Sequence, residues 1–379
     1  MKNKYEKYMK KCITLAKKSQ GWVSPNPLVG AVVFDKNGTL AGIGRHEKYG
    51  EPHAEVNAIK NAKENGYDIK GGTIIVNLEP CSHFGKTPPC ADLIIKEELK
   101  TVVIGCLDPN PKVSGRGIKK LQEAGIEVIT NILEKECKKL NEIFIKNQIK
   151  NTPFISIKTA TTMDGKIATQ NGSSKWITSE KARGEVQKLR NKYDAILTGS
   201  GTVIADNPSL TCRMKNGRNP IRIIIDSELN TIPTAKVYNN DGTKTYIAIF
   251  EDTNTKAFKL KHVEFIKCKK NELTQKIDLQ DLIQKLFEKG IRSILIEAGG
   301  NLNTAFIEAG LVDKIYQFVA PKIICDNNAK SFVDGLNITD INSSKILEIS
   351  KVKSFPPDIL IVMYIPQWID WIIAKNLIE

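Results

Sequence analysis

Four residues near the start of the chain have the types and spacing of a catalytic metal site. His53 and Glu55 stand two positions apart in EPHAEVNAIK, and LEPCSHFGKTPPC supplies Cys81 and Cys90. Two thiolates and a neutral imidazole suit tetrahedral zinc and balance its charge. Three protein ligands leave the fourth position for water, as in catalytic rather than structural zinc sites. We therefore predict that His53, Cys81 and Cys90 bind zinc.

The three ligands are expected at the starts of helices. His53 and Cys81 each follow one proline, and Cys90 follows two. Proline favours the first turn of a helix. Backbone N–H groups at a helix start favour the thiolate, which is the form of cysteine that binds metal.

Glu55 has a different predicted role, because side chains two positions apart do not share a helix face. It is expected to stay off the metal and to relay protons to and from the zinc-activated water. Zinc nucleobase deaminases carry H-x-E followed by P-C-x-x-C, with Glu as the acid/base. Here the first half matches, but eight residues separate Cys81 from Cys90. The predicted chemistry is hydrolysis of an amidine-like ring carbon, with release of ammonia.

Four polar residues are candidates for substrate contact near this site. Asn26 stands in SPNPLVG before the first expected strand, and His83 and Lys86 stand between the two cysteines. Lys86 is a candidate phosphate clamp, and His46 is a further candidate contact. The alternatives also stay open: a turn asparagine, a surface lysine and ordinary loop histidines.

Alternating strands and helices must position these residues. An amphipathic helix is expected at 5–19. Further helices are expected at 53–66, 88–99, 116–125 and 134–150, and strands at 28–35, 71–78, 101–105 and 126–130. This alternation predicts an α/β fold with a mostly parallel sheet covered on both faces.

A second α/β series follows the polar stretch KNQIKNTP, so a domain boundary is expected there. The predicted domains are 1–150 and 151–365, with a tail at 366–379 that either covers a partner subunit or is a loose end. Strands are expected at 154–162, 195–199, 221–226, 244–250, 293–300, 314–321 and 358–365, and helices at 179–193, 279–290 and 301–311.

Composition narrows the class of protein. The 379 residues are 41% hydrophobic, without an apolar run long enough for a transmembrane helix or a signal peptide. Eight cysteines are too few for a disulfide scaffold, which favours reduced thiols and a cytoplasmic location. The net charge of +14 falls on both halves in mixed-sign runs, and 7% aromatic residues give no stacking platform. We expect an anionic small molecule as partner, neither nucleic acid nor membrane, and a homo-oligomer.

Longer motifs carry a family resemblance. SPNPLVGAVV, GEPHAEVNAI, LEPCSHFGKTPPC and DPNPKVSGRGI resemble the bifunctional deaminase/reductase family of riboflavin biosynthesis. TMDGKIAT, SSKWITS, ILTGSGTVIADNPSLTCR, IRIIIDS, ILIEAGGNLNTAFI and LVDKIYQFVAPK resemble its reductase domain, in the same order. The long spacing between the cysteines is a feature of that family.

The resemblance implies a cytidine-deaminase-like three-layer domain followed by a dihydrofolate-reductase-like domain. It implies zinc on His53, Cys81 and Cys90, with Glu55 as proton shuttle. The implied reactions are hydrolysis of the 2-amino group of 2,5-diamino-6-(5-phosphoribosylamino)pyrimidin-4(3H)-one and NADPH-dependent reduction of the ribosyl chain. The implied product is 5-amino-6-(5-phosphoribitylamino)uracil.

The resemblance also implies the reductase site. NADPH contacts would come from Ala160, Trp176, Thr202, Asp206, Ser227, Gly299, Gly300, Asn301, Leu302, Asn303, Thr304 and Ala305. Substrate contacts would come from Ser174, Arg190, Leu210, Arg213 and Glu297. Two features of the sequence itself support this site. EAGGNLNTAF is a strand–Gly–helix junction, which can bind a phosphate, and Arg190 and Arg213 could each bind a phosphate bidentately. They leave open that Arg190 and Arg213 form ion pairs, and that Asp206 forms a turn instead of relaying a proton.

Two other interpretations remain at this point. One is a zinc nucleobase or tRNA deaminase with a non-catalytic second domain. The other is a zinc-stabilised structural module, which would need a fourth ligand such as His83.

Overall fold

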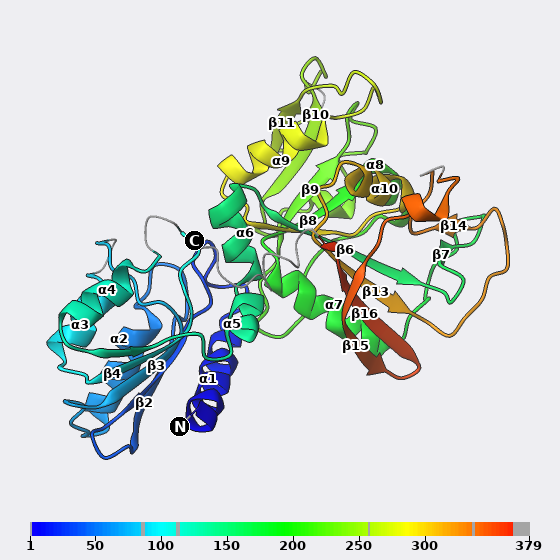
Figure 1. Ribbon diagram of the computed structural model, residues 1–379. Coiled ribbons are helices and arrows are strands. Elements are labelled where there is room, and N and C mark those ends of the chain that lie inside the picture. Colours follow the sequence, from blue (N-terminus) through cyan, green and yellow to red (C-terminus); the bar gives the residue numbers. More distant parts are fainter. Residues whose placement is uncertain (1, 85–87, 111–113, 257, 336–337, 367–379) are drawn as a thin grey trace. The chain divides into compact units, whose positions relative to one another are not determined.

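The computed structural model describes residues 2–84, 88–110, 114–256, 258–335 and 338–366. Its Cα positions form two compact units, one reaching Asn151 and the other beginning at Thr152. Figure 1 shows a sheet with flanking helices in each unit. The tail expected at 366–379 lies outside the described residues, apart from its first residue.

The sheet of the first unit has the strand order β2-β1-β3-β4-β5. These strands are β1 (Gly30–Phe34), β2 (Leu40–Arg45), β3 (Thr73–Leu78), β4 (Thr101–Cys106) and β5 (Glu127–Ile129). β1 runs antiparallel to both β2 and β3, whereas β3, β4 and β5 are parallel. The prediction of a mostly parallel sheet is therefore wrong for this unit, because β2 forms a hairpin with β1 that the sequence did not indicate.

Helices cover both faces of this sheet. They are α1 (Lys2–Lys17), α2 (Ala54–Glu64), α3 (Cys90–Lys96), α4 (Arg116–Glu123), α5 (Glu134–Leu140) and α6 (Glu142–Lys150). Gly30 of β1 lies against α1, while Gly44, opposite its neighbour Ala31, lies against α2. Adjacent strand residues point to opposite faces. The unit is therefore a three-layer α/β/α sandwich.

The single helix expected at 134–150 is two helices that meet at Asn141. The Asn141 side chain accepts a hydrogen bond from the Leu28 N–H at 2.7 Å and donates one to the Leu28 carbonyl at 3.0 Å. These contacts with a distant segment fix Asn141 at the break, and local sequence does not reveal them.

The second unit contains a nine-stranded sheet with the order β11-β10-β9-β8-β12-β6-β13-β16-β15. The strands are β6 (Phe154–Thr161), β8 (Ala195–Gly199), β9 (Ile221–Ile225), β10 (Thr245–Phe250), β11 (Val263–Cys268), β12 (Ser293–Ile296), β13 (Lys314–Val319), β15 (Glu348–Phe355) and β16 (Asp358–Tyr364). All pairs are parallel except those that β16 makes with β13 and β15. The expected parallel sheet is confirmed here, with β11 and β15 as additional edge strands.

Four helices and two short strands complete this unit within the described residues. The helices are α7 (Glu180–Lys192), α8 (Ser200–Asp206), α9 (Leu279–Glu288) and α10 (Gly300–Glu308). β7 (Lys166–Ala168) pairs with β14 (Lys330–Ser331), and single 3-10 turns occur at Lys236–Tyr238 and Ile341–Ser343. None of the helices in the described part of the chain has the length and apolar character needed to cross a membrane.

Candidate active site

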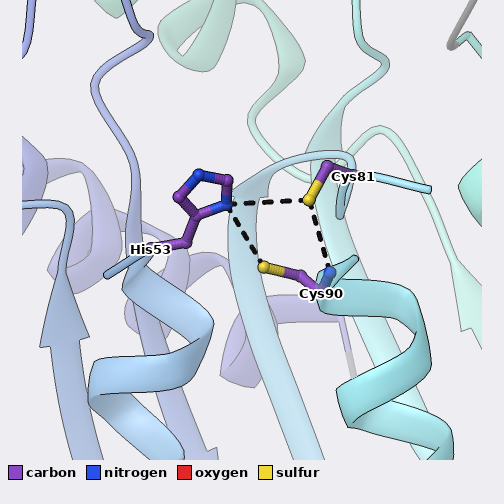
Figure 2. A group of neighbouring side chains, drawn as sticks. All are labelled: His53, Cys81 and Cys90. Atoms are coloured by element: carbon purple, nitrogen blue, oxygen red, sulfur yellow. Dashed lines mark hydrogen bonds between the residues drawn. The ribbon is translucent and has the colours of Figure 1, made fainter. Parts of the chain in front are cut away.

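Three elements of the first unit bring the predicted zinc ligands together (Figure 2). His53 is the N-cap of α2, and Cys90 is the first residue of α3. Cys81 lies in the irregular segment after β3, so the prediction that it opens a helix is wrong. Its sulfur nevertheless accepts a hydrogen bond from the Cys90 N–H at 3.3 Å. The helix start that stabilises the Cys81 thiolate is therefore that of α3.

The distances between the three side chains fit a tetrahedral zinc ion. The His53 Nδ1 atom lies 3.6 Å from the Cys81 sulfur and 3.3 Å from the Cys90 sulfur. The three ligand atoms all lie within 4.8 Å of one another. Zinc with bonds of about 2.0 to 2.3 Å holds neighbouring ligand atoms roughly 3.5–3.8 Å apart. The two nitrogen–sulfur distances are therefore close to those around zinc, and the three ligands are of the types that this ion prefers.

Hydrogen bonds within the group favour its metal-binding form. The Cys90 thiol, and then the His53 ring, lower the pKa of Cys81 to about 4 although burial opposes this. The pKa of Cys90 is raised in turn, because Cys90 holds its proton against the Cys81 sulfur. These shifts favour the thiolate of Cys81, and a bound cation would favour loss of the Cys90 proton as well.

Glu55 is the second residue of α2, in its first turn, and its side chain is buried, with the residue 3% exposed. Burial raises the pKa of Glu55 to about 7, and the Cys81 charge adds to this effect while His53 opposes it. A carboxyl group that titrates near neutrality can both accept and release a proton. This property fits the proton shuttle expected from the sequence.

A pocket of about 350 Å³ opens over these residues and includes three of the four predicted substrate contacts. Asn26, His46 and His83 line it together with His53, Glu55 and Cys81. Lys86 lies outside the described residues.

His46 has both ring nitrogens engaged in this pocket. Its Nδ1 lies 3.1 Å from the Pro52 carbonyl, and its Nε2 lies 3.2 Å from the Asn26 amide nitrogen. Burial lowers the pKa of His46, with a smaller contribution from His53. The neutral ring donating from Nδ1 and accepting at Nε2 satisfies both contacts. His46 therefore orients Asn26 at the pocket wall.

The sequence interpretation missed several pocket residues. Those without an earlier assignment include Tyr49, Glu51, Glu79, Asp108, Asn110, Phe144 and Gln148. Burial raises the pKa of Asp108 to about 6, and the nearby Glu79 charge raises it further. The hydrogen bond from the Asn110 N–H lowers this pKa and so partly offsets the rise. The motif DPNPKVSGRGI, which contains Asp108 and Asn110, was a signal that could have identified both.

In the second unit, the predicted cofactor residues gather at the carboxyl ends of neighbouring parallel strands. Thr202 and Asp206 lie in α8, directly after β8, and Ser227 follows β9. Gly299 caps α10 after β12, and the residues Gly300, Asn301, Leu302, Asn303, Thr304 and Ala305 form its first turns. Ala160 lies near the end of β6, which pairs with β12. Ligands of parallel α/β sheets bind at this edge.

Arg190 and Glu297 form a partly buried, bidentate ion pair in this unit. Arg190 donates from Nε at 2.8 Å and from Nη2 at 2.9 Å to the two Glu297 oxygens. Lys158, which the sequence interpretation did not select, lies 3.3 Å from the same carboxylate. Burial alone would raise the pKa of Glu297, but Arg190 and then Lys158 outweigh it and lower the pKa to about 2. Arg190 is therefore an ion-pair partner in this structure, and its contact with the substrate stays a prediction.

The other predicted reductase residues occupy loops. Ser174 and Trp176 lie between β7 and α7, and the Trp176 ring, 60% exposed, lies 4.5 Å from the Arg183 guanidinium. Leu210 is buried and Arg213 is exposed, both in the segment after α8.

Comparisons with known proteins identify both units. Residues 2–106 match the family described as the cytidine and deoxycytidylate deaminase zinc-binding region, and residues 153–361 match the RibD C-terminal domain. The riboflavin biosynthesis protein RibD of Actinobacillus pleuropneumoniae is 44% identical, with 93% of each chain covered. That of Escherichia coli K12 is 39% identical, covering 84% of this chain and 88% of its relative.

Solved structures agree with these matches over nearly the whole chain. A diaminohydroxyphosphoribosylaminopyrimidine deaminase/5-amino-6-(5-phosphoribosylamino)uracil reductase from Thermotoga maritima has a TM-score of 0.85 at 40% identity, covering 96% of this chain and 99% of its own. Acinetobacter baumannii RibD has a TM-score of 0.85 at 34% identity, with the same coverage.

The first unit is thus a deaminase domain of the cytidine deaminase class, and the second is a reductase domain with a dihydrofolate-reductase-like fold. A chain that carries both is a bifunctional enzyme. It belongs to the RibD family of riboflavin biosynthesis proteins. The fold and the bifunctional activity expected from the resemblance are confirmed, and a non-catalytic second domain is not favoured.

Proposed function

We propose that the deaminase domain hydrolyses the 2-amino group of 2,5-diamino-6-(5-phosphoribosylamino)pyrimidin-4(3H)-one. We further propose that the reductase domain reduces the ribosyl chain with NADPH to give 5-amino-6-(5-phosphoribitylamino)uracil. The observation that carries the first step is the convergence of His53, Cys81 and Cys90 next to a pocket that buried Glu55 lines. The similarity to the deaminase/reductase from Thermotoga maritima supports both steps.

His53, Cys81 and Cys90 would hold zinc, which when bound supplies an activated water for attack on the ring carbon. Glu55 would take the proton of that water and deliver it toward the departing amino group. Its burial and its pKa of about 7 suit both transfers at neutral pH. Asn26, held by His46, would orient the pyrimidine. His83, which lies in the loop between Cys81 and Cys90, would also contact the pyrimidine.

In the reductase domain, NADPH when bound would supply the hydride. The start of α10 after Gly299 offers unpaired backbone N–H groups to a cofactor phosphate. Glu297 would meet the sugar of the substrate, since Arg190 and Lys158 keep it ionised. Asp206, exposed at the end of α8, would relay a proton to the opened sugar.

The test supplies zinc-loaded enzyme, NADPH and the diaminopyrimidine phosphate together and follows ammonia and NADPH in one vessel. We expect one ammonia released and one NADPH oxidised per substrate. Ammonia release without NADPH oxidation would instead support a deaminase with a binding-only second domain. The cytoplasmic location and the homo-oligomeric state remain predictions, to be checked by cell fractionation and light scattering.

A further inference from the structure

Glu79 is a buried carboxylate that no step above uses. It stands between the end of β3 and the Cys81 loop and is 3% exposed. Its Oε2 accepts hydrogen bonds from the backbone N–H groups of Asp108 and Gly115, each at 3.1 Å. Its Oε1 accepts from Gly117 at 3.1 Å and from Ile118 at 3.4 Å. One side chain therefore binds four backbone donors from the segment that leads from β4 into α4.

The backbone at Gly117 packs closely against Glu79 and Pro80. A Cβ atom on Gly117 would lie 2.3 Å from the Pro80 carbonyl oxygen and 3.2 Å from the Glu79 Oε1. The Glu79 N–H also donates to the Cys106 carbonyl at 2.9 Å, which continues the pairing of β3 with β4. Glu79 is thus fixed by its own backbone and holds both the beginning and the end of the segment after β4.

The held segment supplies part of the pocket wall. Asp108 and Asn110 both line the pocket over the His–Cys–Cys group. The Asp108 carboxylate accepts the Asn110 N–H at 2.8 Å, and the Asn110 carbonyl accepts the Ser114 N–H at 2.8 Å. The Asp108 backbone N–H is itself one of the four donors to Glu79. Displacing this N–H would move both polar side chains relative to the substrate.

We propose that Glu79 is a positioning residue for the deaminase substrate. It holds Asp108 and Asn110 at the pocket wall through the backbone, and it acts on substrate binding rather than on metal binding. This inference rests on the deaminase function proposed above.

The test compares wild type with Glu79→Gln as full-length, zinc-loaded enzymes. Glutamine has almost the same shape, but one of its two terminal atoms is an N–H₂ donor that faces backbone donors. We expect the KM for deamination to rise about tenfold or more, because misplaced contact groups weaken binding, while kcat changes less. Zinc content and the kinetics of the reductase on deaminated substrate should stay at wild-type values.

Amide hydrogen exchange gives a readout that does not depend on activity. The amides of Asp108, Gly115, Gly117 and Ile118 should exchange faster in Glu79→Gln than in wild type. Glu123→Gln on α4 is the matched control, because the Glu123 side chain is 66% exposed and outside the pocket. It should change neither the exchange nor the KM.

Three results would overturn the proposal. Unchanged KM in Glu79→Gln would mean that the held segment does not contribute to binding. Loss of zinc would assign Glu79 to the metal site, and loss of reductase activity would assign it to general stability. A wild-type enzyme that releases no ammonia would refute the proposed function itself, whereas an active wild type with an unaffected variant refutes this inference alone.

Discussion

At the scale of single residues, the start of α2 carries both a predicted metal ligand, His53, and the predicted proton shuttle, Glu55. His53 caps α2 and presents Nδ1 to the two sulfurs, while Glu55 sits buried two positions later. The ligand types, the proline before His53 and the spacing of His53 and Glu55 made this arrangement predictable from the sequence. The bond from the Cys90 N–H to the Cys81 sulfur was not predictable, because it joins two segments that only the folded chain brings together.

Glu55→Gln should retain zinc and lose deamination. Glutamine keeps the shape of the side chain but cannot accept the proton of the attacking water, so ammonia release should fall by about 10²–10⁴-fold. Ammonia assays and elemental analysis measure the two properties. Glu64→Gln on the same helix is the control, since the Glu64 side chain is 59% exposed and should leave the rate unchanged. Near wild-type ammonia release from Glu55→Gln would show that another group moves the proton.

Asp206→Asn should impair reduction and leave deamination intact. Asp206 ends α8 at the strand edge where the cofactor residues gather, and asparagine cannot take up or release a proton there. We expect kcat for NADPH oxidation with deaminated substrate to fall at least about tenfold. The exposed Asp252 provides a control through Asp252→Asn. Unchanged kcat and KM in the Asp206 variant would make this residue part of a turn only.

At the scale of elements, the sequence indicated most helices and strands but missed those that depend on distant contacts. β2 was missed because Gly42 and Gly44 weaken its strand pattern. These glycines allow β2 to pack closely against α2, since a Cβ atom on either glycine would lie 2.3 Å from the Ala58 backbone. The edge strand β15 was missed because its residues are mostly polar or exposed. In both cases the missing information lies in the partner element.

Gly44→Ala should reduce deamination although Gly44 contributes no side chain to the pocket. The added methyl group would meet the backbone of Ala58 and Ala54 at 2.3 and 2.4 Å, so β2 and α2 must move apart. α2 carries His53 and Glu55, and a displacement of about 1 Å can lower a rate by on the order of 10²-fold. Ammonia and NADPH assays should show loss of the first activity only.

The control for this change is Gly184→Ala in α7, where a Cβ atom meets nothing within 4 Å. It should leave both activities unchanged. Full deaminase activity in Gly44→Ala would show that α2 tolerates the shift.

At the scale of the whole molecule, the chain holds two units with separate cores and separate chemistry. One hydrophobic cluster draws on residues from Met9 to Leu140 and another on residues from Ile155 to Met363. The ordered motifs made the bifunctional class predictable from the sequence. The detailed sheet orders were not, because central pairs of the second unit, such as β6 with β12 and β6 with β13, join strands that are distant in the chain.

The two units should function when made separately. A chain of residues 1–151 should bind zinc and release ammonia, because its sheet, its helices and the His–Cys–Cys group lie within it. A chain from residue 152 onward should bind NADPH, detected by a difference spectrum in the ultraviolet. Failure of the first piece to bind zinc would show that its core needs the remainder of the chain.

The position of β6 in the middle of the nine-stranded sheet has a consequence for synthesis on the ribosome. β6 is the first strand of its unit to emerge, yet its neighbours β12 and β13 begin only at Ser293 and Lys314. At roughly 5–20 residues per second, on the order of ten seconds pass before either neighbour exists. The apolar Phe154, Ile155 and Ile157 of β6 stay unpaired during that time. We therefore expect the nascent second unit to expose an unpaired apolar strand for longer than the first unit, whose strands have all been synthesised by then.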